Sequence, residues 1–241
     1  MAKKGKPEEF KENKYTPPQA NSGDTLHALA RAGISSIPIV GGAGTELFSL
    51  IVVPPLERRR DSWMNEITDA LLAFEEAGFI TLDDLKDNDV FIDTLLSASQ
   101  IALKSSQEEK RLALRNVILN STKPEPPDES KQHFFLNIID EITVWHIRIL
   151  WLFNDPVHWF RENGIQWPNI SMGSLSAILE TAYPELKGQR AFYDQIWKDI
   201  NSYGLTNTES LHGMMSGNGL REKRTSELGK EFLALIDDPL A

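Results

Sequence analysis

Histidines are the residues of this sequence best suited to bind a metal ion or to act as general bases, so their spacing is informative. No HExxH pair or other close metal-binding spacing joins them. His146 lies six and five positions from Asp140 and Glu141, offsets that do not share one helical face. A lone histidine among apolar neighbours is more often a hydrogen-bonded core residue than a ligand. The spacing predicts no metal site at any of the five histidines, which are His27, His133, His146, His158 and His212.

Motifs for nucleophilic catalysis are missing as well. The chain has no cysteine, which removes disulfides, thiolate zinc ligands and cysteine nucleophiles, and is typical of a reducing compartment. It has no GxSxG motif. The carboxylate pairs Asp83-Asp84 and Asp237-Asp238 fit helix ends or a tail. We therefore expect a cytoplasmic protein without enzymatic activity, metal or cofactor; catalytic residues scattered along the chain are the alternative.

The segment GISSIPIVGGAGTELFSLIVVPPLERRR, residues 33–60, has a glycine cluster that suggests a phosphate-binding loop. Glu46 stands where the P-loop requires a cation, and GxGxxG does not occur. Pro38 and the glycines leave residues 45–53 as the longest helical piece, and about 9 residues at ~1.5 Å each cannot cross a ~30 Å hydrocarbon core. We predict a buried, proline-bounded hairpin and no transmembrane span.

Peripheral contact of this segment with a membrane or a partner is the alternative. Arginines beside an apolar run suit anionic lipid head groups. The candidate contact residues are Leu47, Phe48, Ile51, Arg58, Arg59 and Arg60.

Hydrophobic periodicity predicts a mainly α-helical fold. Trp63, Ile67, Leu71 and Phe74 recur at spacings of four, four and three on a helix over residues 58–77, which Gly78 ends. The sequence divides into a polar, flexible tail over residues 1–23, a helical N-terminal domain over 24–120, a proline-rich linker over 121–131 and a second domain over 132–241.

The second domain is predicted to contain two buried helices, the second ended by Pro156, and then a poorly patterned loop. Phe192, Ile196 and Ile200 form the apolar seam of a later helix. The turn SGNG at residues 216–219 predicts a β-hairpin, and Thr225 is predicted to cap a last helix.

This order of helices, hairpin and closing helix resembles a winged-helix module. The residues that carry the resemblance are Asp199-Ile200, Tyr203-Gly204-Leu205, Thr225, Leu228-Gly229 and Phe232-Leu233. Over its whole length the chain also resembles the bacterial abortive-infection alpha family, through IPIVGGAGTELFSLIVVPPLERR and RTSELGKEF. The resemblance implies an N-terminal helical bundle followed by a winged-helix-like domain with a small β-hairpin, and a role in phage defence. It supplies no catalytic residues.

A winged-helix module raises the question of DNA binding. The candidate nucleic-acid contacts are Arg190, Lys198, Arg221, Lys223 and Arg224. The whole chain has a net charge of −10, and residues 131–241 contain 10 basic against 14 acidic residues, a net charge of −4. This balance disfavours capture of a phosphate polyanion.

We therefore expect a non-enzymatic defence or regulatory protein that acts through contacts with an unidentified protein partner. A DNA-binding winged-helix transcriptional regulator is the alternative, and a membrane-associating stress effector is the third. Trp159 and Trp167, among polar residues of the predicted loop, are candidate partner contacts, although aromatic core residues would give the same pattern. The sequence does not indicate the oligomeric state.

Overall fold

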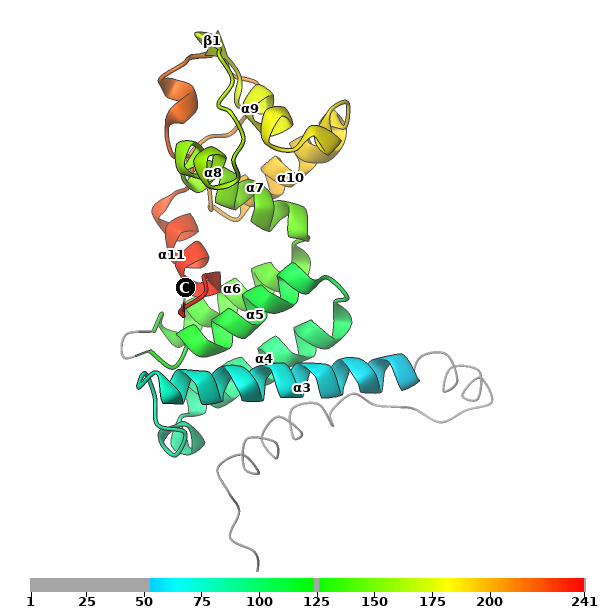
Figure 1. Cartoon of the computed structure of the whole chain (residues 1–241), viewed down its shortest axis with the longest axis vertical. Coiled ribbons are helices and arrows are strands. Elements are labelled where there is room, and N and C mark those ends of the chain that lie inside the picture. The colour runs from blue at the N-terminus through cyan, green and yellow to red at the C-terminus, as the bar shows by residue number, and fades with distance from the viewer. Residues whose placement is uncertain (1–52, 124–125, 241) are drawn as a thin grey trace, which may run out of the picture.

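The computed structural model describes residues 53–123 and 126–240, which are mainly helical (Figure 1). The predicted tail, Leu47, Phe48, Ile51 and most of the predicted hairpin lie outside the described residues. The earlier elements are α3 (Val53–Glu76), the 3₁₀ turn η1 (Asp84–Asp87), α4 (Asp89–Lys104), α5 (Glu108–Asn120) and α6 (Glu129–Glu141). The later helical elements are α7 (Val144–Asn154), α8 (Pro156–Glu162), α9 (Leu175–Ala182), η2 (Pro184–Leu186), α10 (Arg190–Ser202), η3 (Gly219–Arg221) and α11 (Glu227–Ile236).

Helix α3 confirms the predicted apolar stripe. Trp63, Ile67, Leu71 and Phe74 are all buried. Gly78 follows the helix with φ +77°, a left-handed conformation that glycine adopts without strain, and its N–H donates to the carbonyl of Glu75 at 2.9 Å. The helix begins five residues earlier than predicted.

Proline begins helices in this fold at two places where the sequence suggested an end. Pro54 and Pro55 lie in the first turn of α3, and Pro156 is the first residue of α8. The first N–H groups of a helix have no intrahelical partner, so a proline there loses no hydrogen bond. Asp155 caps α8 by accepting from the N–H of His158 at 3.0 Å. The predicted loop after Pro156 is therefore wrong in its first six residues, Val157–Glu162.

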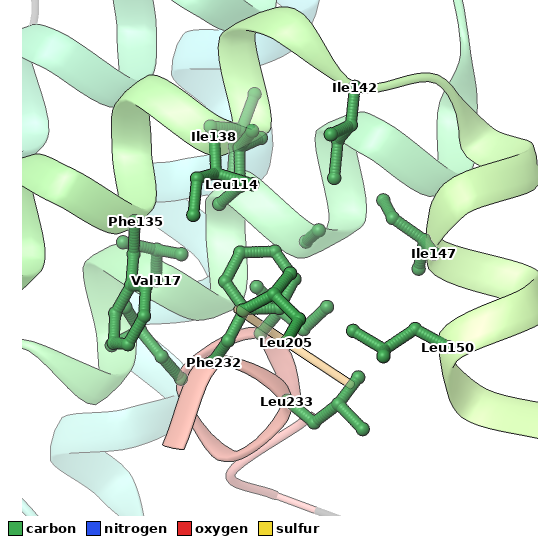
Figure 2. Packing of buried hydrophobic residues seen from close by; sticks show 14 of the residues in the cluster. Leu114, Val117, Phe135, Ile138, Ile142, Ile147, Leu150, Leu205, Phe232 and Leu233 are labelled. Carbon is green, nitrogen blue, oxygen red and sulfur yellow. The ribbon is translucent and has the colours of Figure 1, made fainter. Parts of the chain in front are cut away.

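The core is continuous across the proline-rich segment 121–131. Helix α6, which begins inside this segment at Glu129, packs against α4, and α11 packs against α5 (Figures 1 and 2). The rings of Phe135 on α6 and Phe232 on α11 meet edge to face, with centroids 5.5 Å apart. One cluster of buried side chains includes residues from both sides of the segment. The division into two domains stays a prediction.

Helix α11 is also fixed through its carboxyl-terminal carbonyls. The side-chain amide of Asn116 on α5 donates to the carbonyl of Ile236 at 3.0 Å. The amide of Asn120 donates to the carbonyls of Leu235 at 2.8 Å and Asp237 at 2.9 Å. The last carbonyls of a helix lack intrahelical donors, so these two buried asparagines complete the end of α11.

A small antiparallel sheet completes the fold, but its two strands do not form the predicted hairpin. Strand β1 (Met172–Gly173) precedes α9 and pairs with β2 (Met215–Ser216), which follows α10. Gly217 donates its N–H to the carbonyl of Ser171 at 2.8 Å, and a Cβ on Gly217 would lie 2.9 Å from the carbonyl oxygen of Ile170. The glycine in SGNG thus permits close contact with a segment more than 40 residues earlier.

Two further predictions about side chains are corrected. Phe192 is 41% exposed, and Tyr193, Ile196, Trp197 and Ile200 form the buried face of α10. The cap of α11 is Ser226, whose hydroxyl accepts from the N–H of Gly229 at 2.9 Å.

Thr225, predicted as that cap, is buried instead. It forms a bridge with Thr206, and its hydroxyl donates to the side chain of Asn154 at 2.8 Å.

Gly204, Leu205 and Gly229, which carried the resemblance in the sequence, belong to one contact in the structure. Ser226 joins them, because its N–H donates to the Leu205 carbonyl at 3.0 Å and its hydroxyl donates to the Gly204 carbonyl at 2.6 Å. A Cβ on Gly229 would lie 2.1 Å from the carbonyl oxygen of Leu205. The first turn of α11 can approach this backbone only without a side chain at position 229.

We predict that Gly229→Ala lowers the free energy of unfolding by about 1–3 kcal/mol or more, because backbone atoms cannot move aside as a flexible side chain can. The measurement is urea denaturation followed by circular dichroism. Gly213→Ala is the matched control, since a Cβ there meets nothing within 4 Å. Equal stability of the two variants would contradict the assigned contact.

Candidate functional site

The predicted nucleic-acid contacts on α10 differ in their surroundings. Arg190 is exposed, and its guanidinium lies 3.3 Å from the carboxylate of Asp194. Asp194 also lies 2.6 Å from the imidazole of His212. Lys198 is exposed on the same helix. The carboxylate of Asp194 therefore offsets the charge of Arg190, one of the two candidate cations on this helix.

The three candidate cations near η3 are each engaged within the protein. Arg221 lies over the ring of Trp167, 4.7 Å from its centroid. The amine of Lys223 lies 3.0 Å from the carboxylate of Asp155. The side chain of Arg224 is 13% exposed, and its guanidinium donates to a backbone carbonyl of η3. These contacts give all three side chains structural roles.

The arginines predicted to face a membrane or partner lie in the second and third turns of α3. Arg58 is exposed, whereas Arg59 and Arg60 are half-buried, and Arg60 lies 3.5 Å from Asp61. Over the ranges 53–123 and 126–240, no helix has the length and apolar character needed to cross a bilayer.

Trp159 and Trp167, the aromatic candidates, belong to one row of rings in edge-to-face or tilted contact. Trp167 contacts Phe160 at 5.0 Å between centroids, and Phe160 contacts Trp159 at 5.5 Å. Trp159 contacts Tyr183 at 5.1 Å, and Tyr183 meets Trp145 edge to face at 5.4 Å. We call these five residues the aromatic row. Except for the buried Phe160, all its members are half-buried.

A cleft of about 530 Å³ opens beside this row and is lined by residues of α5, α7 and α8 and of the end of α11. Trp151 and Trp159 line it together with Tyr183, and Leu112 and Ile147 add aliphatic surface. Leu112 on α5 is 37% exposed, so part of its aliphatic surface is accessible in the cleft. We call this hollow the aromatic cleft.

A second hollow of about 370 Å³ extends the aromatic cleft along α5 and α7. Both hollows are lined by Glu109, Leu112 and Arg148, and the second adds Trp145. The guanidinium of Arg148 lies over Trp145, 5.1 Å from the ring centroid, and forms two hydrogen bonds with the carboxylate of Glu109. This bidentate pair fixes the wall between the two hollows.

Further hydrogen bonds hold other residues that line the aromatic cleft. Tyr183 donates its hydroxyl to the carbonyl of Arg148 at 3.3 Å, and burial raises the pKa of this phenol, so it is neutral. Arg115 donates to Asp238 at 2.9 Å and to the side chain of Asn116. The walls are therefore formed before any ligand binds.

The sequence pointed to only two residues of the aromatic row. Trp145 and Trp151 lie on α7, whereas Tyr183 follows α9, 38 positions after Trp145. Helical periodicity placed Trp145 and Trp151 in a buried helix, with no sign that their rings reach a surface cleft. The ion pair between Glu109 and Arg148 spans 39 positions and had no local signal.

His146 is a structural residue. It is 6% exposed, and its Nδ1 accepts from the N–H of Thr143 at 3.0 Å, which completes a capping box at the start of α7. Its Nε2 lies 3.5 Å from the carboxylate of Asp199 on α10. Burial, the largest influence, lowers the pKa of this imidazole, and the carboxylate of Asp199 partly opposes it. No group of potential metal ligands occurs among the residues that the structure describes.

We predict that His146 makes the protein less stable in mild acid. In the unfolded chain its pKa takes the ordinary value of 6.5, above the folded value, so the unfolded state binds the extra proton first as pH falls. The contribution of His146 to the free energy of unfolding is full above pH 6.5. It is lost as pH decreases toward the folded pKa, at up to about 1.4 kcal/mol per pH unit. The measurement is urea denaturation from about pH 7 to about pH 5.

His146→Gln should flatten this decline in the free energy of unfolding. His133→Gln is the control, because His133 is exposed. If the curves of wild type and His146→Gln run parallel through this range, the imidazole does not remain neutral in the folded state.

The chain matches no protein-family model, no curated protein and no solved structure. The resemblances to winged-helix modules and to the abortive-infection alpha family therefore stay predictions, and the role of this protein is inferred from the geometry of the aromatic cleft.

Proposed function

We propose that this protein is a non-enzymatic defence or regulatory protein that binds a segment of a protein partner in the aromatic cleft. The observation that carries the proposal is the half-buried state of Trp145, Trp151, Trp159 and Tyr183 around two joined hollows. Tryptophan and tyrosine in such positions supply large contact areas and lose little side-chain entropy on binding.

A preformed site strengthens the proposal. Edge-to-face contacts hold Trp145 against Tyr183, and the pair of Arg148 with Glu109 holds the wall beside them. Side chains that are already ordered pay little entropy when a ligand binds, so a modest contact area gives useful affinity.

We also propose that the later elements form a winged-helix-like unit. The order β1, α9, α10 and β2, together with the bridge between Thr206 and Thr225, supports this arrangement. The charges of α10 and η3 favour protein over DNA as its partner. The contacts of Arg190 with Asp194 and of Lys223 with Asp155 reduce the positive charge available to phosphates.

We predict that Trp159→Ala weakens binding of selected peptides by about tenfold or more, the loss expected when a central aromatic contact is removed. Peptides are first selected from a random phage-displayed library with the wild-type protein. Their Kd values for wild type and variant are then measured by fluorescence anisotropy.

Trp167→Ala is the matched control, because Trp167 belongs to the same aromatic row but does not line the cleft. Thermal unfolding of both variants checks that they fold. The proposal fails if the library yields no binding peptide, or if every selected peptide binds Trp159→Ala as tightly as wild type.

A further inference from the structure

The charges that line the aromatic cleft are unequal. Its carboxylates are Glu109, Glu162, Asp237 and Asp238, and its guanidinium groups are Arg115 and Arg148. Each guanidinium is already paired, Arg148 with Glu109 and Arg115 with Asp238. Two carboxylates, those of Glu162 and Asp237, are therefore in excess.

These two carboxylates lack a permanent cation. Asp237 is exposed, its carboxylate accepts the N–H of Asp238 at 3.1 Å, and no lysine or arginine in the described part of the chain pairs with it. Glu162 lies 2.8 Å from the imidazole of His158, which is a cation only when protonated. The rim of the cleft thus keeps a negative charge near neutral pH.

The tryptophans that line the main hollow also lack a cation. The two stacked arginines of the described ranges lie over Trp145 and Trp167. Trp151 and Trp159 have no such partner there, and both are half-buried at the wall of the cleft. An aromatic face in a partly desolvated site attracts a lysine or arginine side chain.

We propose that the partner segment is cationic and apolar: a lysine or arginine of the partner lies against Trp151 or Trp159 and is neutralised by Glu162 and Asp237. An apolar residue of the same segment packs on Leu112. This inference rests on the proposed function and adds the chemistry of the ligand. The net charge of −10 speeds the approach of such a segment.

The test uses three labelled amphipathic peptides of one length and one leucine pattern, whose polar positions are all lysine, all glutamine or all glutamate. Anisotropy titrations with the full chain should give a Kd for the lysine peptide at least about tenfold below those of the other two. The double variant Glu162→Gln, Asp237→Asn should weaken the lysine peptide by about tenfold at low salt, and added salt should reduce this difference.

Glu209→Gln is the control for general attraction to an acidic protein. Glu209 is exposed between α10 and β2 and does not line the cleft. The inference is overturned if Glu209→Gln weakens binding of the lysine peptide as much as Glu162→Gln alone does, or if the double variant binds this peptide as tightly as wild type does. A different outcome is that the glutamine or glutamate peptide binds more tightly than the lysine peptide and loses this binding in Trp159→Ala. That result would overturn the inference that the ligand is cationic and would leave the proposed function standing.

Discussion

The attachment of α11 to α5 is the constraint on which the rest of the structure depends. The amides of Asn116 and Asn120 supply the donors that the last carbonyls of α11 lack, and Phe232 inserts its ring against α6 (Figure 2). The chain that leaves α11 is thereby placed at the mouth of the aromatic cleft, where Asp237 and Asp238 line it. The buried side-chain amides hold the end of α11 in a fixed position, and this also fixes Asp237 and Asp238 at the rim of the cleft.

Helix α5 supports the other end of the cleft in the same way. Lys110 is 7% exposed, and its amine donates to the carbonyls of Asp140 and Ile142 at 2.9 Å each, at the bend between α6 and α7. Burial lowers the pKa of this amine, and the two charge-assisted hydrogen bonds offset part of the desolvation. One helix thus fixes both the bend that starts α7 and the end of α11, and the cleft lies between these two points.

Local patterns predicted most of the helices and little of the cleft. The spacing of Trp63, Ile67 and Leu71 was enough to identify α3, because each helix buries one face whatever it packs against. Proline was misread at Pro156, since the same ring that ends one helix is well placed to begin the next. The prediction of a hairpin at Gly217 was wrong for a different reason. Its glycine is required by the backbone of Ile170, a contact between distant segments that no local turn rule contains.

The charge that a surface offers to a ligand depends on which of its charged side chains are already paired within the protein. A run of cations near η3 suggested a phosphate-binding wing, yet Arg221, Lys223 and Arg224 are each engaged by a ring, a carboxylate or a carbonyl. In the aromatic cleft, pairing within the protein leaves negative charge available. Its guanidinium groups are used to hold the walls together, and this leaves two of its carboxylates in excess. The paired charges hold the walls together, so a ligand meets only the two carboxylates in excess. Beside the half-buried Trp151 and Trp159, this excess favours a cationic ligand.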